Sequence, residues 1–392
     1  MRASRIAAIA FAVLAFGVVA YQHFGVDDGA GVEAPAFGTP TLLGPTPGRS
    51  FANRLIATPD GGALLAGQSD DAGWLLRLDA DLSPVWSDRL TVRDGAKASL
   101  FAAAADLDGA VFAAGSAWSN ADAPALILRR YEADGAPGWE TVIEPGGFFA
   151  QAQGVARLDG GALHTAGAAF GRETGPNRLG LVARFSADGA QRWLRNDLDG
   201  WPEAVTGAGV AGYVAGWTPT DAGDEASAFW VARLDDAGAL IWARSLRDGA
   251  ADRALAMAAS AQRVFASGFQ RDGGNAIASA VVAAYDPDGA PLWRAQDVVD
   301  DADAAFDRLA LAGDGGVVAA GYVIRRADGV GALILSRFGP NGETLWRRTI
   351  ARTAQLNAIS GVAVIGDSVV LAVSAAGDSR SAQVALFQAP LR

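Results

Sequence analysis

The sequence predicts an all-β fold, a seven-bladed β-propeller of four-stranded antiparallel blades. A tryptophan recurs about every 50 residues, and a glycine that ends an apolar run recurs with the same period. Each repeat also holds four short apolar runs, which is the pattern of a propeller blade. The tryptophans are Trp86, Trp139, Trp193, Trp242, Trp293 and Trp346, and the glycines are Gly67, Gly115, Gly167, Gly216, Gly268 and Gly321.

The N-terminal segment precedes the repeats. Arg2 and Arg5 stand before an apolar run, and Ala20 offers a small residue for cleavage, so residues 1–20 are predicted to be a signal peptide. The alternative is an uncleaved signal anchor. Either reading exports the rest of the chain, as a soluble periplasmic protein or as one anchored in the inner membrane. Residues 21–39 are predicted to be a linker and residues 40–392 the propeller.

The four apolar runs of a repeat are named strands A to D in chain order. In the first repeat they lie near Arg54–Thr58, Ala63–Gln68, Trp74–Leu78 and Pro84–Leu90. Runs of four to seven apolar residues broken by Gly, Asp and Asn are typical of strands. Strands B and C are apolar without interruption, because a blade is covered by a neighbour on both faces.

The seventh repeat is incomplete. Leu356–Ser360, Asp367–Val373 and Ala382–Phe387 match strands A to C, and the sequence ends at Arg392 without a fourth strand. The strand-like segment Thr41–Leu43 precedes the first complete repeat. We expect it to complete the seventh blade, because closure of the ring removes two exposed sheet edges.

The connection between strands C and D carries a repeated Asp-Gly or Asn-Gly pair. This pair predicts a two-residue type I′ turn, in which an arginine of strand C lies opposite the tryptophan of strand D. A cation–π contact is therefore expected within each pair. In the first repeat Leu82 replaces the turn glycine, which predicts a different turn there. The pairs are Arg130–Trp139, Arg184–Trp193, Arg233–Trp242 and Arg337–Trp346.

Composition excludes several classes of function. The net charge of −11 repels a phosphate backbone, so no nucleic-acid partner is expected. The absence of cysteine excludes disulfides, iron–sulfur clusters and a lipoprotein anchor. With two histidines in the chain, no metal site is predicted. His164 aligns with apolar strand B residues such as Phe112 and Phe265, so we expect it in the core.

The lengths of the connections place a candidate binding surface. The B–C and D–A connections, which open on one face (the variable face), differ in length and composition, whereas the A–B and C–D turns of the opposite face (the turn face) are uniform. Variable loops on a rigid scaffold carry function. Exposed aromatics there would contact a partner, although they could instead cover gaps between blades. The binding-face candidates are Trp118, Trp201, Trp217, Phe170, Arg172, Arg271, Arg325 and Arg326.

A second set of polar residues stands near the start of the inner strands. Their oxygen atoms could bind a cation or polar ligand at the channel mouth, or they could cap turns and bond a neighbouring blade. The loop Asp300–Asp303 could similarly bind calcium, although a solvated acidic loop explains it as well. The channel-mouth candidates are Asn53, Gln153, Glu203, Asp252, Asp307 and Asn357.

The repeat motif also carries a resemblance. With Asp-Gly-Gly-x-x-x-Ala-Gly followed by Asp-Gly-x-x-x-Trp, residues 51–388 resemble bacterial repeat propellers, and the C–D segment is similar to the motif of quinoprotein-type (PQQ-like) propellers. The resemblance rests on turn and packing residues and implies a fold. Quinoprotein dehydrogenases are usually longer and eight-bladed, and many carry adjacent cysteines at the cofactor, which this chain lacks.

Together these features predict an exported, non-catalytic, monomeric propeller that binds a protein or glycan partner at the bacterial cell envelope. No residue is identified as catalytic and no cofactor is predicted. The alternative is a periplasmic enzyme on the same fold, either a quinone-dependent dehydrogenase or a sugar-acting hydrolase or lyase. That alternative requires convergent carboxylates in a central pocket, or bound quinone with calcium.

Overall fold

Four-stranded antiparallel sheets make up the structure. A computed structural model describes residues 41–43, 50–92, 96–118, 124–143, 148–171, 178–220, 226–246, 251–271, 278–351, 358–376 and 382–391. The expected signal segment and linker lie outside these residues. Among them, one 3₁₀ turn (Asp159–Gly161) interrupts the β-structure, and no helix is long and apolar enough to cross a membrane.

The described residues form 28 strands. The first three blades contain β2 (Ser50–Ala57), β3 (Ala63–Ser69), β4 (Ala72–Leu78), β5 (Pro84–Leu90), β6 (Lys97–Ala105), β7 (Val111–Trp118), β8 (Ala125–Tyr131), β9 (Pro137–Ile143), β10 (Phe148–Arg157), β11 (Leu163–Gly171), β12 (Arg178–Phe185) and β13 (Gln191–Arg195). Blades four to seven contain β14 (Trp201–Ala208), β15 (Ala211–Pro219), β16 (Ser227–Leu234), β17 (Leu240–Leu246), β18 (Arg253–Ala259), β19 (Val264–Arg271), β20 (Ala278–Tyr285), β21 (Pro291–Asp297), β22 (Ala302–Leu311), β23 (Val317–Arg325), β24 (Gly331–Phe338), β25 (Thr344–Ala351), β26 (Ala358–Ile365), β27 (Ser368–Ala376), β28 (Ala382–Pro390) and β1 (Thr41–Leu43).

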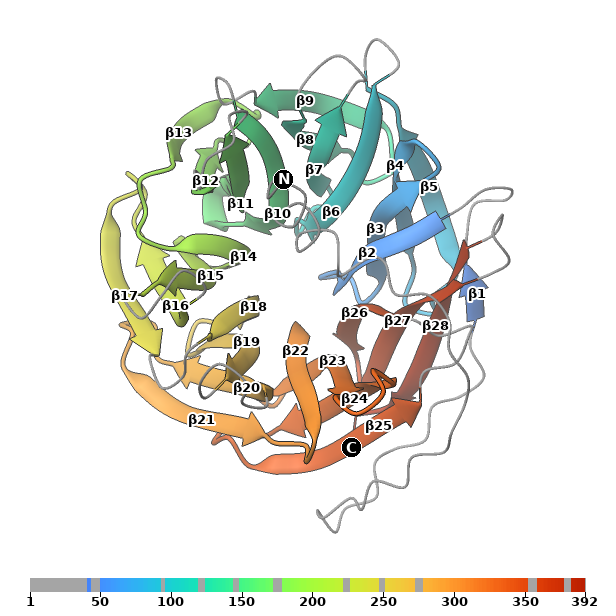
Figure 1. Cartoon of the computed structure of the whole chain (residues 1–392). Coiled ribbons are helices and arrows are strands. Elements are labelled where there is room, and N and C mark those ends of the chain that lie inside the picture. Colours follow the sequence, from blue (N-terminus) through green and yellow to red (C-terminus); the bar gives the residue numbers. More distant parts are fainter. Residues whose placement is uncertain are drawn as a thin grey trace, which may run out of the picture.

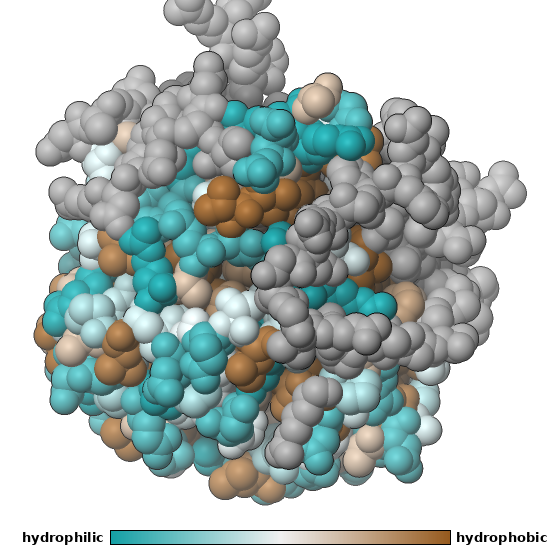
Figure 2. All heavy atoms as spheres, turned by 90° about the horizontal axis from the view of Figure 1, so that it is seen from below, coloured by the Kyte–Doolittle hydropathy of each residue, from teal (hydrophilic) through white to brown (hydrophobic). Residues whose placement is uncertain are grey.

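These strands form seven sheets arranged in a ring, which confirms the predicted seven-bladed propeller (Figure 1). Each blade runs from strand A at the axis to strand D at the rim. Figure 2 views the ring from its rim and shows a largely hydrophilic surface with separate hydrophobic patches. Exposed apolar residues of the outer strands, such as Ile241 and Leu292, belong to this rim. Single exposed apolar residues are normal for a soluble surface.

The seventh blade is closed by the N-terminal strand, as predicted. β1 pairs antiparallel with β28, with Thr41 opposite Leu386 and Leu43 opposite Val384. Figure 1 shows the blue β1 beside the red β28. The inner strand of this blade, β26, spans Ala358–Ile365, and the first two residues of the predicted run, 356–357, lie outside the described residues. The ring is therefore held shut by pairing of the two ends of the propeller.

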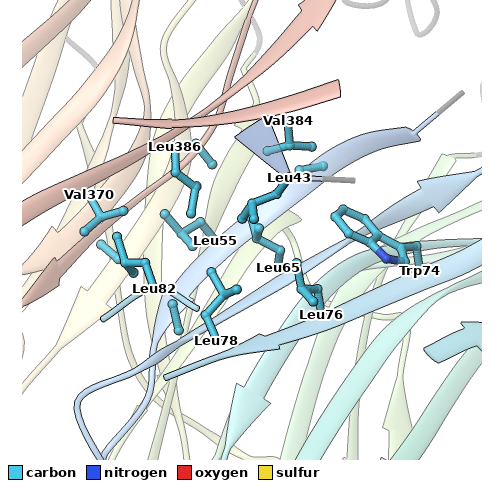
Figure 3. Packing of buried hydrophobic residues seen from close by; sticks show 14 residues of the cluster. Leu43, Leu55, Leu65, Trp74, Leu76, Leu78, Leu82, Val370, Val384 and Leu386 are labelled. Carbon is cyan, nitrogen blue, oxygen red and sulfur yellow. The ribbon is translucent and has the colours of Figure 1, made fainter. Parts of the chain in front are cut away.

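A hydrophobic cluster lies under this closure. Leu43 from β1 packs with Val384 and Leu386 from blade seven and with Leu55 and Trp74 from blade one (Figure 3). All five side chains are buried. Burial of one leucine side chain contributes about 1.5–3 kcal/mol, so the closure draws on packing as well as on strand pairing.

The recurring tryptophans join neighbouring blades. In each of six blades the indole Nε1 donates a hydrogen bond of 2.9–3.0 Å to a backbone carbonyl of the next blade. The Trp139 indole, for example, binds the Ala187 carbonyl and covers Gly189 of blade three. A Cβ atom added to Gly189 would lie 2.5 Å from the Trp139 ring. Five of the six indoles, all except Trp346, thus occupy the space that a turn glycine leaves open.

The expected register of the C–D hairpins is confirmed in three of the four predicted pairs, but the expected cation–π contacts are wrong. Arg184 lies opposite Trp193 and Arg337 lies opposite Trp346. Among the described residues, none of the four predicted pairs forms a cation–π contact, and the indoles turn instead toward the next blade. The Trp139 indole, for example, donates a hydrogen bond to a backbone carbonyl there and packs against Gly189.

The strand C arginines bind the A–B turns in two blades. The Arg337 guanidinium is buried, pairs with Asp314 at 2.5 Å and donates to the Val317 carbonyl at 3.2 Å. Arg77 binds Asp60 and the Ala63 carbonyl in the same way. A Cβ atom on Gly316 would lie 2.5 Å from Arg337 Nη1. The repeated Asp-Gly-Gly motif therefore supplies the carboxylate and the space for this arginine.

The C–D turns are three-residue loops, not the predicted two-residue type I′ turns. In blade two the Gly135 N–H donates to the Glu132 carbonyl at 2.9 Å, and Glu132 N–H donates to the Ala136 carbonyl at 2.8 Å. Only the third loop residue, Gly135, has a positive φ (86°). This is a type I turn followed by a left-handed residue, which also brings the two strands into hairpin register.

Blade one has the same turn, although a different one was expected. Leu82 adopts the left-handed conformation (φ 61°) and its N–H donates to the Asp79 carbonyl. Its side chain is buried in the closure cluster near Val370 of blade seven (Figure 3). Blade seven has no tryptophan in its fourth strand, so Leu82 fills from the turn side the space that an indole fills elsewhere. This packing offsets the cost of the left-handed conformation.

Candidate functional site

The inner strand of every blade contains one extra residue. The pairing of strands A and B shifts register at this residue, which marks a β-bulge. The bulge residues are Asn53, Phe101, Gln153, Glu203, Leu255, Asp307 and Ser360. Bulges redirect side chains, and here they do so in the strand of each blade that lies at the axis of the ring.

The strand B glycine makes room for this bulge in six blades. A Cβ atom on Gly67 would lie 1.9 Å from the carbonyl oxygen of Phe51, two residues before Asn53. The equivalent glycines of blades two to six show separations of 1.8–1.9 Å. Any side chain at this position would push strand A away. The glycine that marks the repeat in the sequence therefore marks the bulge in the structure.

The channel-mouth candidates do not form one ring. Asn53, Gln153, Glu203 and Asp307 are bulge residues, whereas Asp252 lies three positions before the bulge of blade five. Asp252 is fully buried, and its carboxylate accepts hydrogen bonds from the Arg271 N–H (3.0 Å) and from Gln270 Nε2 (3.3 Å). These hydrogen bonds give Asp252 a structural role within blade five. The remaining candidate, Asn357, lies outside the described residues.

Asn53 also has a structural role. Its Nδ2 donates to the Leu100 carbonyl at 2.7 Å and to Ser99 Oγ at 3.3 Å, which links blade one to blade two. This is the neighbouring-blade bond that the sequence left open as an alternative to ligand binding. Phe101 and Leu255 occupy the same position in other blades, so no continuous ring of polar groups surrounds the axis.

Two of the predicted aromatics come together at the variable face of blade four. Trp201 and Trp217 are cross-strand neighbours with ring centroids 3.9 Å apart and planes at 64°. Trp217 is buried, and Trp201 remains partly exposed. Glu203 Oε1 accepts the Trp217 Nε1–H at 3.2 Å, and the Arg253 guanidinium of blade five lies 4.5 Å above the Trp217 ring. We call these four residues the Trp201 cluster.

The Trp201 cluster holds one aromatic surface in a fixed position. Trp217 packs against Trp201, while a carboxylate and a guanidinium bind Trp217 from two blades. An indole whose orientation is fixed in advance loses little conformational entropy when a ligand covers it. Arg253 was not among the sequence candidates. Its place at the start of β18, one residue after a polar candidate, was the signal that could have indicated it.

Three of the predicted arginines bind the acidic residues of their own face. Arg326 pairs with Asp303 at 2.8 Å, and Arg271 approaches the same carboxylate at 3.7 Å. Partial burial acts to raise the pKa of Asp303, but the hydrogen bonds from Arg326 and the Ala278 N–H, with the charge of Arg271, lower it overall. Asp303 thus links blade five to blade six.

Arg325 pairs with Asp328 at 2.5 Å within the B–C connection of blade six. Trp118 lies half-buried at the end of β7, opposite Lys97. Phe170 lies in β11 opposite Arg178, and Arg172 lies outside the described residues. The structure therefore brings together Trp201 with Trp217 and Arg271 with Arg326, at separate places on the variable face.

His164 lies in the core, as predicted. It is fully buried, its ring packs edge-on against Trp193, and Nε2 lies 3.2 Å from Arg184 Nη1. Burial, together with the positive charge of Arg184, lowers the pKa of His164 to about 3. Among the described residues, no group of three or more His, Cys, Asp or Glu side chains is arranged to hold a metal ion.

Comparisons with known proteins show similarity in fold. No protein-family model and no curated protein matches the sequence. A chain of "Crystal Structure of Mitotic Checkpoint Complex" is 11% identical, with a TM-score of 0.56 and coverage of 96% of this chain and 99% of that one. A chain of "Drosophila Plexin A in complex with Semaphorin 1b" is 11% identical, with a TM-score of 0.50 and coverage of 91% and 88%.

A streptogramin B lyase structure is also 11% identical, with a TM-score of 0.48 and coverage of 89% of this chain and 97% of that one. The matches to the checkpoint-complex and plexin chains show the propeller fold and identify no family. Because one fold hosts many functions, they do not assign an activity.

Proposed function

We propose that this chain is an exported, non-catalytic propeller that binds a protein partner at the bacterial cell envelope through its variable face. The observation that carries the proposal is the Trp201 cluster, in which the partly exposed Trp201 indole packs on Trp217, and Glu203 and Arg253 bind Trp217. Tryptophan and arginine dominate binding energy at protein interfaces. Two of the similar propellers come from structures of protein complexes, which is consistent with a protein partner.

The two faces of the ring differ in what they offer a partner. The turn face repeats one C–D loop, whose residues are explained by hydrogen bonds and by the left-handed conformation at its third position. The variable face differs from blade to blade and combines an aromatic cluster with arginine–aspartate pairs. Differences between blades allow a partner to bind in one orientation, which a repeated surface does not.

Blade four provides a matched test of the two faces. A photo-crosslinking phenylalanine analogue is placed at Trp201 in one version of the full-length chain and at Val210 in another. Trp201 is at the variable end of the β14–β15 hairpin, whereas Val210 is 60% exposed at its turn end. Irradiation in the producing cells should give a discrete protein adduct from position 201, and mass spectrometry identifies it.

The identified partner then allows affinities to be compared. Trp201→Ala should weaken its binding at least tenfold, while Val210→Ala should leave it within about twofold, as expected for a hot-spot residue and a non-contact residue. A carbohydrate adduct at position 201 would show that the partner is a glycan and not a protein. An adduct confined to position 210 would contradict the choice of face.

Export is tested separately. The envelope fraction of the producing cells should contain the chain, and its N-terminal sequence should begin at Tyr21 if the signal is cleaved after Ala20. A chain that keeps Met1 and stays with the inner membrane would establish the signal anchor. Recovery in the cytoplasm alone would exclude export.

A further inference from the structure

Two arginines stand at equivalent positions of the inner strands, away from the Trp201 cluster. Arg54 of β2 and Arg308 of β22 occupy the same place in blades one and six, the residue directly after the bulge. The other five blades have alanine or glycine there. Those residues are Ala102, Gly154, Ala204, Ala256 and Gly361. Large cationic side chains are thus confined to the two blades that flank blade seven.

Arg308 contacts the inner strands of other blades. Its Nε donates to the Ser360 carbonyl of blade seven at 3.0 Å, and its Nη2 lies 3.5 Å from the Asn53 carbonyl of blade one. Its Nη1 donates to the carbonyl of Asp307 and lies 3.4 Å from that carboxylate. The Arg308 side chain therefore runs along the inner strands of three consecutive blades, six, seven and one.

Arg54 lies within the electrostatic field of this group but lacks a bond to it. Among the described residues, none forms a hydrogen bond or ion pair with its guanidinium. The side chain is surrounded by protein, although part of it remains accessible. This environment and the positive charge of Arg308, opposed by the carboxylate of Asp307, lower the pKa of Arg54 to about 10. A guanidinium in such a place is costly unless an anion pairs with it.

Blade seven adds two hydroxyl groups beside the inner strand of blade one. Ser360 Oγ and Ser374 Oγ lie 2.7 Å apart, and Ser374 Oγ lies 3.5 Å from the Ala52 carbonyl, next to the bulge of blade one. With two guanidinium groups and one carboxylate, the junction carries a net positive charge. Guanidinium groups bind the planar, paired oxygens of carboxylates and phosphates with good geometry.

We propose that Arg54 and Arg308 form a binding site for a small oxyanion at the axis of the ring. Arg308 is held in place by blade seven and blade one, and Arg54 supplies the unpaired charge. The ligand is a carboxylate or a phosphate, because both present the oxygens that two guanidinium groups can share. The proposed site does not depend on partner binding at the Trp201 cluster. It is inferred from the two inner strands that carry arginine where the other five carry alanine or glycine.

The test uses the full propeller with inorganic phosphate and with succinate as probes. Ionic strength is kept constant with chloride, and calorimetric titration and thermal unfolding are both measured. One of the two anions should bind saturably and raise the Tm with increasing concentration, since a ligand of the folded state stabilises it by mass action. Saturable binding of phosphate would identify a phosphate site, and saturable binding of succinate would identify a carboxylate site.

Arg54→Gln is the decisive variant, because Arg308 also holds the inner strands together. Arg54→Gln should weaken binding at least tenfold. Without added anion it should unfold at the same temperature as the wild type or at a higher one, because a repelling charge is gone. Arg192→Gln, on the exposed surface of β13, removes the same charge and should bind normally. Absence of saturable binding of both anions to the wild type, or equal binding by the two variants, would overturn the proposal.

Discussion

The buried imidazole of His164 should make the propeller sensitive to mild acid. The pKa of His164 is lowered from 6.5 to about 3, so between these values the unfolded chain binds a proton that the folded chain rejects. Stability is therefore present above pH 6.5 and is lost as the pH falls toward 3. From pH 7.5 to pH 5.0 this one group should lower the free energy of unfolding by about 2 kcal/mol.

Replacement of the imidazole isolates this effect. His164→Phe places an aromatic ring that blades two and five already carry at the equivalent position, as Phe112 and Phe265. Tight packing against Gly212 will cost the variant some stability, since a Cβ atom there would lie 2.0 Å from the imidazole. That cost is the same at both pH values and cancels when the two are compared.

Urea unfolding at pH 7.5 and pH 5.0 measures the difference. The wild type should lose about 2 kcal/mol more than His164→Phe over this range. Phe265→Leu, a core change in the same column without a titratable group, should retain the wild-type pH dependence. Equal pH dependence in the wild type and in His164→Phe would refute the assignment of a neutral, buried His164.

Three further substitutions test the packing between blades through the midpoint of urea unfolding. Gly189→Ala should cost about 2–4 kcal/mol, because φ is 83° and the new methyl group would meet Trp139, whereas Gly313→Ala, with no atom within 4 Å, should be close to neutral. Leu82→Gly should cost about 1–3 kcal/mol, because the cavity it leaves outweighs the relief of the left-handed backbone; a gain in stability would show that Leu82 fills no space. Leu43→Ala should cost about 2–4 kcal/mol, and an unchanged midpoint would mean that β1 does not hold the ring closed.

The repeat period and the closing strand could be predicted because they depend on local sequence. Apolar runs, turn residues and a missing fourth strand are all visible along the chain, and Thr41–Leu43 is the segment that supplies the strand. The contact of Trp139 with Gly189 could not be found in this way. It joins two blades, and a register argument within one hairpin gives no information about the neighbouring blade.

The turn type was missed for a different reason. An Asp-Gly pair suits both a two-residue type I′ turn and the third position of a three-residue loop. Leu82 was the residue that could have distinguished them, since a loop that needs one left-handed position tolerates a non-glycine residue better than a loop that needs two. Its burial against blade seven is a tertiary effect.

The positions of the candidate residues in the fold were predicted in part. The variable face and Trp201 with Trp217 followed from the alignment of the repeats, but one extra residue in each inner strand shifted the polar candidates. The repeat pattern aligned Asp252 with Asn53, but the structural equivalent of Asn53 in blade five is Leu255, three residues later. The sequence of strand A alone does not reveal a bulge, although the strand B glycine opposite it in six blades was already identified as a repeat marker.

Hydrogen exchange of the chain, alone and saturated with the protein partner identified by crosslinking at position 201, tests the proposed binding face most directly. Protection should concentrate at the variable ends of β14, β15 and β18, around Trp201, Trp217 and Arg253. The C–D loops near Gly135 and Gly189 should exchange at the same rate in both states. Protection of those loops, with unchanged exchange around Trp201, would contradict binding through the variable face.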